Sequence, residues 1–270
     1  MVVPKKSLGQ NFLRDENIAR KIAAEIDPKR NDVLLEIGPG TGALTAYLAG
    51  ATDHYLGVEV DPRSLELLRT RFPKAEFLQK SILDVRLDDL ERRFGSKIRV
   101  AGNIPYYITS EILFWIIDQR THVTDAVLMM QLEVARRLTA KPRTKDYGIL
   151  SVVTQLYGAP LIAFKVSPNS FFPVPAVDSA LVHITMRQDV PSHNEDLLRH
   201  MVRGTFGKRR KTLYNGLRYA GYPQGSLKQL TADLSRRPEE LSVEEFLALT
   251  TELEPLWNSQ EMNTIRNTHA

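Results

Sequence analysis

The chain has 270 residues, of which 43% are hydrophobic and 25% are charged, a composition typical of an ordinary globular protein. It has no cysteine, which excludes disulfides, thiolate metal sites and a cysteine nucleophile, and its six histidines show no close pair at metal-ligand spacing. No apolar stretch approaches the roughly 20 residues that span a bilayer, and the N-terminus lacks the apolar core of a secretory signal. We therefore expect a cytoplasmic protein with no metal site and no membrane contact.

Short apolar runs alternate with amphipathic segments over the first 140 residues. The runs predict strands at 33–37, 54–61, 75–82, 97–104 and 125–131, and the segments between them predict helices at 42–49, 62–72, 110–120 and 132–140. Strands that alternate with helices predict a mostly parallel, doubly wound α/β sheet.

The pattern changes beyond about residue 140. Apolar runs at 150–158, 160–168 and 179–187 have no long helix between the last two, so we expect the sheet to end in an antiparallel pair. A polar linker then leads into helical patterns at 195–206, 211–220, 226–234 and 242–253. We predict a catalytic domain at 1–188, a small all-helical domain at 189–257 and a polar tail at 258–270.

A glycine-rich loop, "EIGPGTG", follows the first predicted strand. Gly38 and Gly40 would let the backbone approach a ligand closely, and Glu59 ends the next strand, where an acid can hold ribose hydroxyls. The spacing Gly-x-Gly-x-x-Ala also satisfies the dinucleotide fingerprint, so an NAD-dependent oxidoreductase stays open. Glu36 before the first glycine and Pro39 within the loop favour S-adenosylmethionine.

The fourth predicted strand ends in an aromatic corner, "GNIPYY". The Asn103 side-chain oxygen and the Pro105 carbonyl could accept the two hydrogens of an exocyclic amine, such as adenine N6, whose lone pair is otherwise delocalised into the ring. Tyr106 would stack on the target base, and Phe171 in a proline-rich loop could provide a second ring. The alternatives are a plain turn whose rings pack on the core and, for Phe171, a hydrophobic plug over the sheet edge. Tyr107 stays undecided, with packing favoured.

Positive charge is clustered, although the net charge is only +4 and the sequence pI is about 9.2. Basic stretches occur at 135–145, at 207–218 and at Lys5–Lys6. Such clusters on a nearly balanced chain indicate a polyanion-binding face, with a solvated helix face as the alternative for any one of them.

Five motifs give the chain a family resemblance. "LGQNFLRD", "EIGPGTG", "GNIPYYITS", "FFPVPAVDSALV" and "FGKRRKTLYNGL" occur in the order and spacing of the ribosomal RNA adenine N6,N6-dimethyltransferases, from about residue 5 to 255. "VDSA" and "FxxRRKTL" look more like the housekeeping branch that acts on small-subunit rRNA than like the antibiotic-resistance branch that acts on large-subunit rRNA. The resemblance implies a Rossmann-like S-adenosylmethionine-dependent methyltransferase domain.

The resemblance also implies particular cofactor contacts. The family usually has an aspartate after the third strand, at the cofactor's adenine amine, where this chain has Ser81. Either Ser81 makes a weaker contact or Asp84 reaches in, and Ile82 would pack on the adenine ring. Together with the glycine loop, the predicted cofactor residues are Asn11, Leu13, Gly38, Gly40, Glu59, Ser81, Ile82 and Asn103.

The substrate implied by the resemblance is 16S rRNA within a small-subunit precursor particle. Four methyl groups would go to two adjacent adenosines of its 3′-terminal hairpin, and Lys208, Arg209 and Arg210 would contact phosphates. We expect a monomer with a role in small-subunit biogenesis. A non-enzymatic RNA-binding assembly factor that uses only the basic faces is a third hypothesis.

Overall fold

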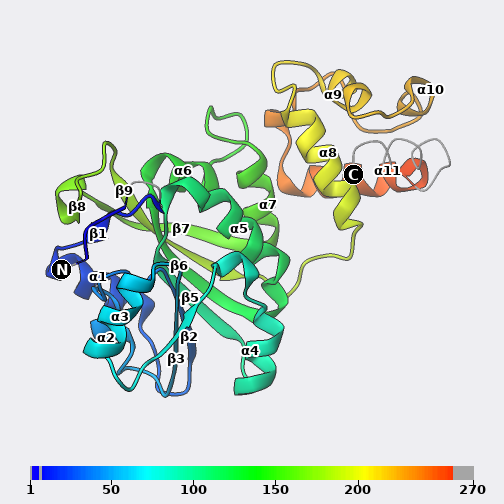
Figure 1. Ribbon diagram of the computed structural model, residues 1–270. Coiled ribbons are helices and arrows are strands. Elements are labelled where there is room, and N and C mark those ends of the chain that lie inside the picture. Colours follow the sequence, from blue (N-terminus) through cyan, green and yellow to red (C-terminus); the bar gives the residue numbers. More distant parts are fainter. Residues whose placement is uncertain (1, 6–7, 258–270) are drawn as a thin grey trace. The chain divides into compact units, whose positions relative to one another are not determined.

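The computed structural model describes residues 2–5 and 8–257, so the predicted polar tail and Lys6 lie outside the described residues. The chain divides into two compact units (Figure 1). One comprises the residues up to Thr139 together with Tyr157–Gln188, and the other comprises Ala140–Leu156 and the residues from Asp189 onward. Residues 140–156, which the sequence analysis placed in the catalytic domain, therefore group with the helical unit.

The described part of the first unit contains a seven-stranded sheet in the order β4-β3-β2-β5-β6-β9-β7. Its first five strands run parallel, and β9 is antiparallel to both β6 and β7, as expected for a sheet that ends in an antiparallel pair. The predicted α/β class is confirmed. The strands are β2 (Val33–Ile37), β3 (His54–Glu59), β4 (Glu76–Gln79), β5 (Ile98–Asn103), β6 (Val123–Gln131), β7 (Gly158–Val166) and β9 (Ser179–Met186).

Helices cover both faces of this sheet. The helices α1 (Glu16–Ile26), α2 (Thr45–Leu48) and α3 (Pro62–Arg71) bury leucine, isoleucine and alanine side chains in one shared core with strand residues. On the other side of the sheet lie α4 (Leu87–Phe94) and α5 (Thr109–Asp118) (Figure 1). The chain then continues from β6 into α6 (Leu132–Leu138).

The starts of two predicted helices, α3 and α2, are explained by the residues that precede them. The Asp61 side chain accepts from the backbone of Arg63, with Pro62 in the first turn, so α3 begins as predicted. The segment 42–49 is helical only from Thr45 to Leu48, because the glycine loop forms turns up to Leu44. The apolar patterns of the sequence do not predict α1 or α4.

A separate two-stranded ribbon pairs segments that lie far apart in the sequence. β1 (Phe12–Leu13) and β8 (Phe171–Phe172) are antiparallel, with Phe12 opposite Phe172 and Leu13 opposite Phe171. The ribbon joins the N-terminal segment to the proline-rich loop before β9.

The second unit is helical. The Phe206 ring packs against Tyr147 and Phe246, which ties the loop 140–148 and two helices into one core. A helix predicted at 226–234 is wrong beyond Leu227, because Thr231 and Ala232 donate their backbone N–H groups to the Glu252 carboxylate instead. The helices are α7 (Ile149–Tyr157), α8 (Glu195–Phe206), α9 (Leu213–Tyr219), α10 (Gln224–Leu227) and α11 (Val243–Trp257).

Candidate active site

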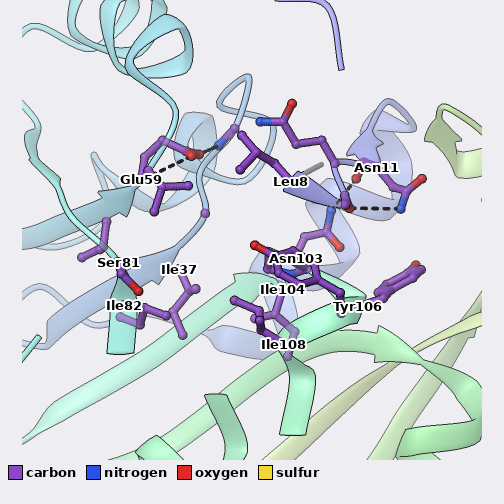
Figure 2. Close-up of a pocket in the computed structure, with 18 of the residues that line it drawn as sticks. Leu8, Asn11, Ile37, Glu59, Ser81, Ile82, Asn103, Ile104, Tyr106 and Ile108 are labelled. Atoms are coloured by element: carbon purple, nitrogen blue, oxygen red, sulfur yellow. Dashed lines mark hydrogen bonds between the residues drawn. The ribbon is translucent and has the colours of Figure 1, made fainter. Parts of the chain in front are cut away.

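A cleft lies at the carboxyl ends of β2, β3, β4 and β5, the edge where open α/β sheets bind ligands (Figure 2). It encloses about 810 Å³ of space, including the open solvent at its mouth, and the N-terminal segment forms one wall. Of the residues predicted from the sequence, it brings together Asn11, Gly38, Gly40, Glu59, Ser81, Ile82, Asn103, Pro105 and Tyr106.

The glycine loop has the backbone geometry that its sequence predicted. Gly38 and Gly40 adopt φ angles of +61° and +59°, which other residues rarely adopt. A Cβ atom on Gly40 would lie 3.0 Å from the Phe12 ring, which lines the cleft. The missing side chains therefore both permit the turn and leave room for a ligand against the backbone.

Glu59 holds this loop in place. Its Oε2 accepts from the backbone N–H of Gly40 at 3.0 Å, and its Oε1 accepts from those of Val60 and Asp61, each at 2.9 Å. Burial raises the pKa of Glu59, while these backbone hydrogen bonds act in the opposite direction. Within the described part of the chain Oε2 receives one hydrogen bond and has a second lone pair, so a buried carboxylate at the cleft wall can accept from a ribose hydroxyl.

Glu36 and Leu13 lie beside the cleft rather than in it. Both line a small adjoining cavity, which also contacts Asn103. The Oε2 atom of Glu36 accepts from the Thr45 hydroxyl at 2.9 Å and from the Tyr55 hydroxyl at 2.5 Å. Burial raises the pKa of Glu36 to about 7. Leu13 is buried in the core cluster, so the structure gives it a supporting position instead of a place in the cleft wall.

Glu36→Gln should remove a pH dependence of stability. Because the folded protein holds a proton on Glu36 that the unfolded chain releases, the free energy of unfolding of the wild type falls as pH rises from about 4.5 to about 7. The variant should lack this fall and gain at most about 3 kcal/mol above pH 7, since its Oε1 can still accept from both hydroxyls. Urea denaturation at several pH values measures this, with Glu66→Gln on an exposed face as the control. Parallel pH profiles for the wild type and Glu36→Gln would contradict it.

Asn103 presents its side-chain oxygen because its nitrogen is already used. The Nδ2 atom donates to the Asn11 carbonyl at 2.9 Å, which fixes the amide orientation, and within the described part of the chain no donor engages Oδ1. The Pro105 carbonyl accepts from the Ile108 N–H at 3.3 Å and from the Thr109 hydroxyl at 3.2 Å. Asn103 is thus the better prepared of the two predicted acceptors.

The two tyrosines of the corner have different surroundings. The Tyr106 hydroxyl lies 2.6 Å from the Ser179 Oγ, so one end of the ring is held in place while the ring lines the cleft. Burial raises the pKa of Tyr106, which keeps its hydroxyl protonated. Tyr107 is exposed, and its ring packs over Gly9, where a Cβ atom would lie 2.7 Å away. Tyr107 therefore covers the N-terminal segment.

Phe171 does not occupy the position that the sequence analysis gave it. Its side chain is only 1% exposed and belongs to the core cluster, and it is absent from the described residues that line the cleft. Successive side chains of a strand point to opposite sides, so the neighbouring Phe172 is 47% exposed. The prediction of Phe171 as a ring that stacks on the base is corrected by this burial; the plug described as its alternative matches the structure better.

Ser81 and Ile82 line the cleft after β4, whereas Asp84 is exposed and lines a different depression. The Ser81 hydroxyl accepts from the Leu83 backbone at 3.3 Å. Of the two residues weighed for the contact to the cofactor's adenine, Ser81 is therefore the one placed at the cleft.

Sequence reasoning missed the role of Gln10. Its Nε2 donates to the Asp61 carboxylate at 3.0 Å and its Oε1 accepts from the Lys5 backbone at 2.8 Å, so it ties the N-terminal segment to the end of β3. Arg63 holds the pKa of Asp61 at about 2, which keeps that carboxylate ionised. The motif "GQNFL" contained Gln10, but only the structure shows its partner. Lys80, also unpredicted, lines the cleft beside Ser81.

The basic residues after α8 are not equivalent. Lys208 and Arg210 are exposed, and the Lys208 ammonium lies 4.9 Å from the centre of the Tyr219 ring. The Arg209 guanidinium instead donates to the carbonyls of Thr144 and Lys145, at 3.0 and 2.6 Å. Arg209 therefore stabilises the loop 140–148 within the helical unit.

Arg209→Ala and Arg210→Ala should separate stability from RNA binding. Losing two hydrogen bonds from a charged donor should make Arg209→Ala less stable by about 1–2 kcal/mol in urea denaturation. If Arg210 contacts one phosphate, Arg210→Ala should instead reduce the slope of log affinity for rRNA against log salt by about 0.7–0.9. Equal effects of the two substitutions on both measurements would refute this division of roles.

Comparisons with known proteins place the chain in a family. Residues 3–254 match the family described as ribosomal RNA adenine dimethylase. Ribosomal RNA small subunit methyltransferase A of Chlorobium phaeobacteroides (strain BS1) is 43% identical over 256 residues, which cover 94% of this chain and 95% of the relative. The enzyme of the same name from Geobacter sulfurreducens is 41% identical, with 91% of this chain and 94% of the relative covered.

Two solved structures share the fold over most of the chain. A dimethyladenosine transferase from Plasmodium falciparum superposes with a TM-score of 0.78 at 25% identity, covering 90% of this chain and 98% of the other. The 23S rRNA methyltransferase ErmE gives a TM-score of 0.66 at 28% identity, covering 90% and 100%.

The fold and the cleft define a Rossmann-like methyltransferase that uses S-adenosylmethionine. This chain belongs to the ribosomal RNA adenine dimethylase family. Membership of this family decides against the oxidoreductase that the glycine spacing also allowed. Within the described residues, no helix is long and apolar enough to cross a membrane.

Proposed function

We propose that this enzyme dimethylates two adjacent adenosines in the 3′-terminal hairpin of 16S rRNA, within a precursor of the small ribosomal subunit. The observation that carries the chemistry is the oriented amide of Asn103 at the carboxyl edge of the sheet, beside the glycine loop and Glu59. The choice of the small subunit rests on relatives named ribosomal RNA small subunit methyltransferase A. Such a substrate is cytoplasmic, and we infer that the enzyme acts there as a monomer.

The cleft fits S-adenosylmethionine through its own residues. Gly38 and Gly40 leave the backbone open to the amino acid part, the Glu59 carboxylate receives ribose hydroxyls, and Ile82 offers an apolar wall to the adenine. When bound, S-adenosylmethionine supplies a methyl group made electrophilic by its sulfonium.

Asn103 would act on the acceptor amine. Its Oδ1 accepts one N6 hydrogen. The Pro105 carbonyl accepts the other when the Thr109 hydroxyl bonds only to its second acceptor, the Tyr106 carbonyl at 3.2 Å. Two such bonds favour a pyramidal nitrogen whose lone pair is available for the new N–C bond. Each transfer releases one N6 proton to solvent, so a monomethylated adenine retains a single hydrogen and needs one acceptor only. The same corner therefore supports both methylations, and no covalent enzyme intermediate is needed.

Tyr106 would hold the flipped base. Removing an adenine from its stack costs a few kcal/mol, and stacking on an aromatic ring returns about 1–3 kcal/mol. The bond from Tyr106 to the buried Ser179 keeps this ring in place before the base arrives, which reduces the entropy lost on binding.

Labelled S-adenosylmethionine tests the substrate. Isolated protein should transfer label to the small-subunit rRNA of particles that lack the modification, and digestion should release dimethyladenosine from adjacent positions. Label found only in large-subunit rRNA would refute the proposed substrate and assign the protein to the other branch of the family. If neither the small-subunit nor the large-subunit rRNA is labelled, the activity itself is refuted.

A further inference from the structure

We propose that Phe172 and Arg14 form a platform that binds the unpaired base next to the target adenine. This platform is distinct from the predicted role of Phe171 and rests on the proposed function, because it needs an RNA strand that delivers one base into the cleft. Three features support the platform: the register of the β1–β8 ribbon, the contact of Arg14 with Phe172, and the link between the loop after β8 and Tyr106.

The ribbon register places Phe172 on the side of the ligand cleft. Phe12 and Phe172 are direct partners in an antiparallel pair, and the side chains of such partners lie on the same side of the ribbon. Phe12 lines the cleft. Leu13 and Phe171 form the other pair and are both buried. Figure 1 shows β1 and β8 next to each other, and the register puts the exposed Phe172 directly opposite Phe12 of the cleft wall.

Arg14 places a positive charge beside the Phe172 ring. The centre of its guanidinium lies 5.3 Å from the centre of the Phe172 ring, within the range of a cation–π contact. The backbone N–H of Arg14 donates to the Ser170 carbonyl at 2.8 Å. Because Ser170 lies two residues before Phe172, this bond keeps Arg14 close to the Phe172 ring. Despite this contact, Phe172 remains 47% exposed.

These features match an unpaired nucleotide. An aromatic surface stacks on any base, and an adjacent guanidinium neutralises the phosphate that joins that base to the next. A protein partner would not require a planar ring beside an exposed cation. The RNA that presents an adenine to Asn103 must place its neighbouring nucleotides at the rim of the same cleft, where this platform lies.

The platform is also connected to the ring that holds the target base. The loop that begins at Phe172 passes the exposed Val174 and Val177 and enters β9 at Ser179, whose hydroxyl bonds to Tyr106. A base on Phe172 would therefore press on the loop that supports Tyr106, and the two bases would be held by one continuous segment.

Phe172→Leu tests the platform, because leucine keeps an apolar side chain but has no flat face. With under-methylated small-subunit particles, its KM should rise about 5-fold or more, the lower end of what one stacked base is worth, while kcat and the affinity for S-adenosylhomocysteine stay unchanged. Phe172→Trp should restore the KM. Arg14→Gln should raise the KM less and reduce its salt dependence.

The control is Leu161→Ala, which removes an apolar side chain that is 64% exposed on β7. It should leave the KM unchanged. If the wild type methylates the particle and Phe172→Leu has the same KM as the wild type, the platform is overturned while the proposed function stands. An inactive wild type would instead overturn the proposed function. A raised KM that Phe172→Trp fails to restore would show that the loop, and not the ring, was responsible, and would also overturn the inference.

Discussion

Asn103→Ala should lower the rate of methyl transfer by about 10²- to 10³-fold, as the loss of one preorganised group that stabilises a transition state commonly does. The variant loses the acceptor at the amine and the bond that anchors Asn103 to the Asn11 carbonyl. Affinity for S-adenosylhomocysteine should change by less than about tenfold, which is the size of one hydrogen bond. Single-turnover kinetics with labelled cofactor and particles separates the two effects.

Asn103→Asp sharpens this experiment. Aspartate keeps an acceptor oxygen, but in place of Nδ2 it puts a second oxygen against the Asn11 carbonyl, so the side chain loses its fixed orientation. Its rate should fall between those of the wild type and Asn103→Ala. Asn169→Ala, an exposed position outside the cleft lining, is the matched control. A nearly normal rate in Asn103→Ala would refute the assigned role.

Glu59→Gln should weaken cofactor binding by about 10²-fold or more. Every carboxylate oxygen of Glu59 accepts a hydrogen bond from a backbone N–H, and an amide would turn an N–H₂ group toward at least one of these donors. The variant would lose charge-assisted bonds to the ribose as well as the support of Gly40. Calorimetric titration with S-adenosylhomocysteine measures the change, and Glu66→Gln serves as the exposed control.

The affinity of the wild type should also depend on pH. Because burial raises the pKa of Glu59 above the ordinary value of 4.5, protonation should begin at a higher pH than for an exposed glutamate. Cofactor affinity should therefore fall as pH falls through the raised pKa, since the protonated carboxyl offers one acceptor fewer. A wild-type affinity that does not fall as pH is lowered over the acidic range in which the protein stays folded, or an affinity unchanged in Glu59→Gln, would argue against ribose binding at Glu59.

The main features of the fold and of the cleft follow from short-range patterns. The strands of the parallel sheet are marked by short segments rich in apolar residues, and parallel strands place their carboxyl ends at one edge. Gly38, Glu59 and Asn103 each follow directly from such a run, so their convergence is predictable without knowing any side-chain contact.

Other features depend on pairings between distant segments. Phe171 and Phe172 are adjacent aromatic residues, and only the register of β8 against β1, about 160 positions earlier, decides which of them is buried. Arg209 looked like its basic neighbours until the loop 140–148 supplied its acceptors. The apolar spacing beyond Leu227 suggested a helix, but Glu252 binds the backbone of Thr231 and Ala232. None of these partners can be identified from local sequence.

The hydrogen bond from Asn103 to the Asn11 carbonyl makes the start of the chain part of the catalytic apparatus. The acceptor is a backbone atom, so no ordinary point substitution at position 11 deletes it, and only displacement of the whole segment can. A bulky N-terminal tag or proteolytic clipping that displaces the segment around Asn11 would therefore slow methyl transfer while the sheet stays folded. An inactive preparation with a normal circular dichroism spectrum should first have the mass of its N-terminus checked.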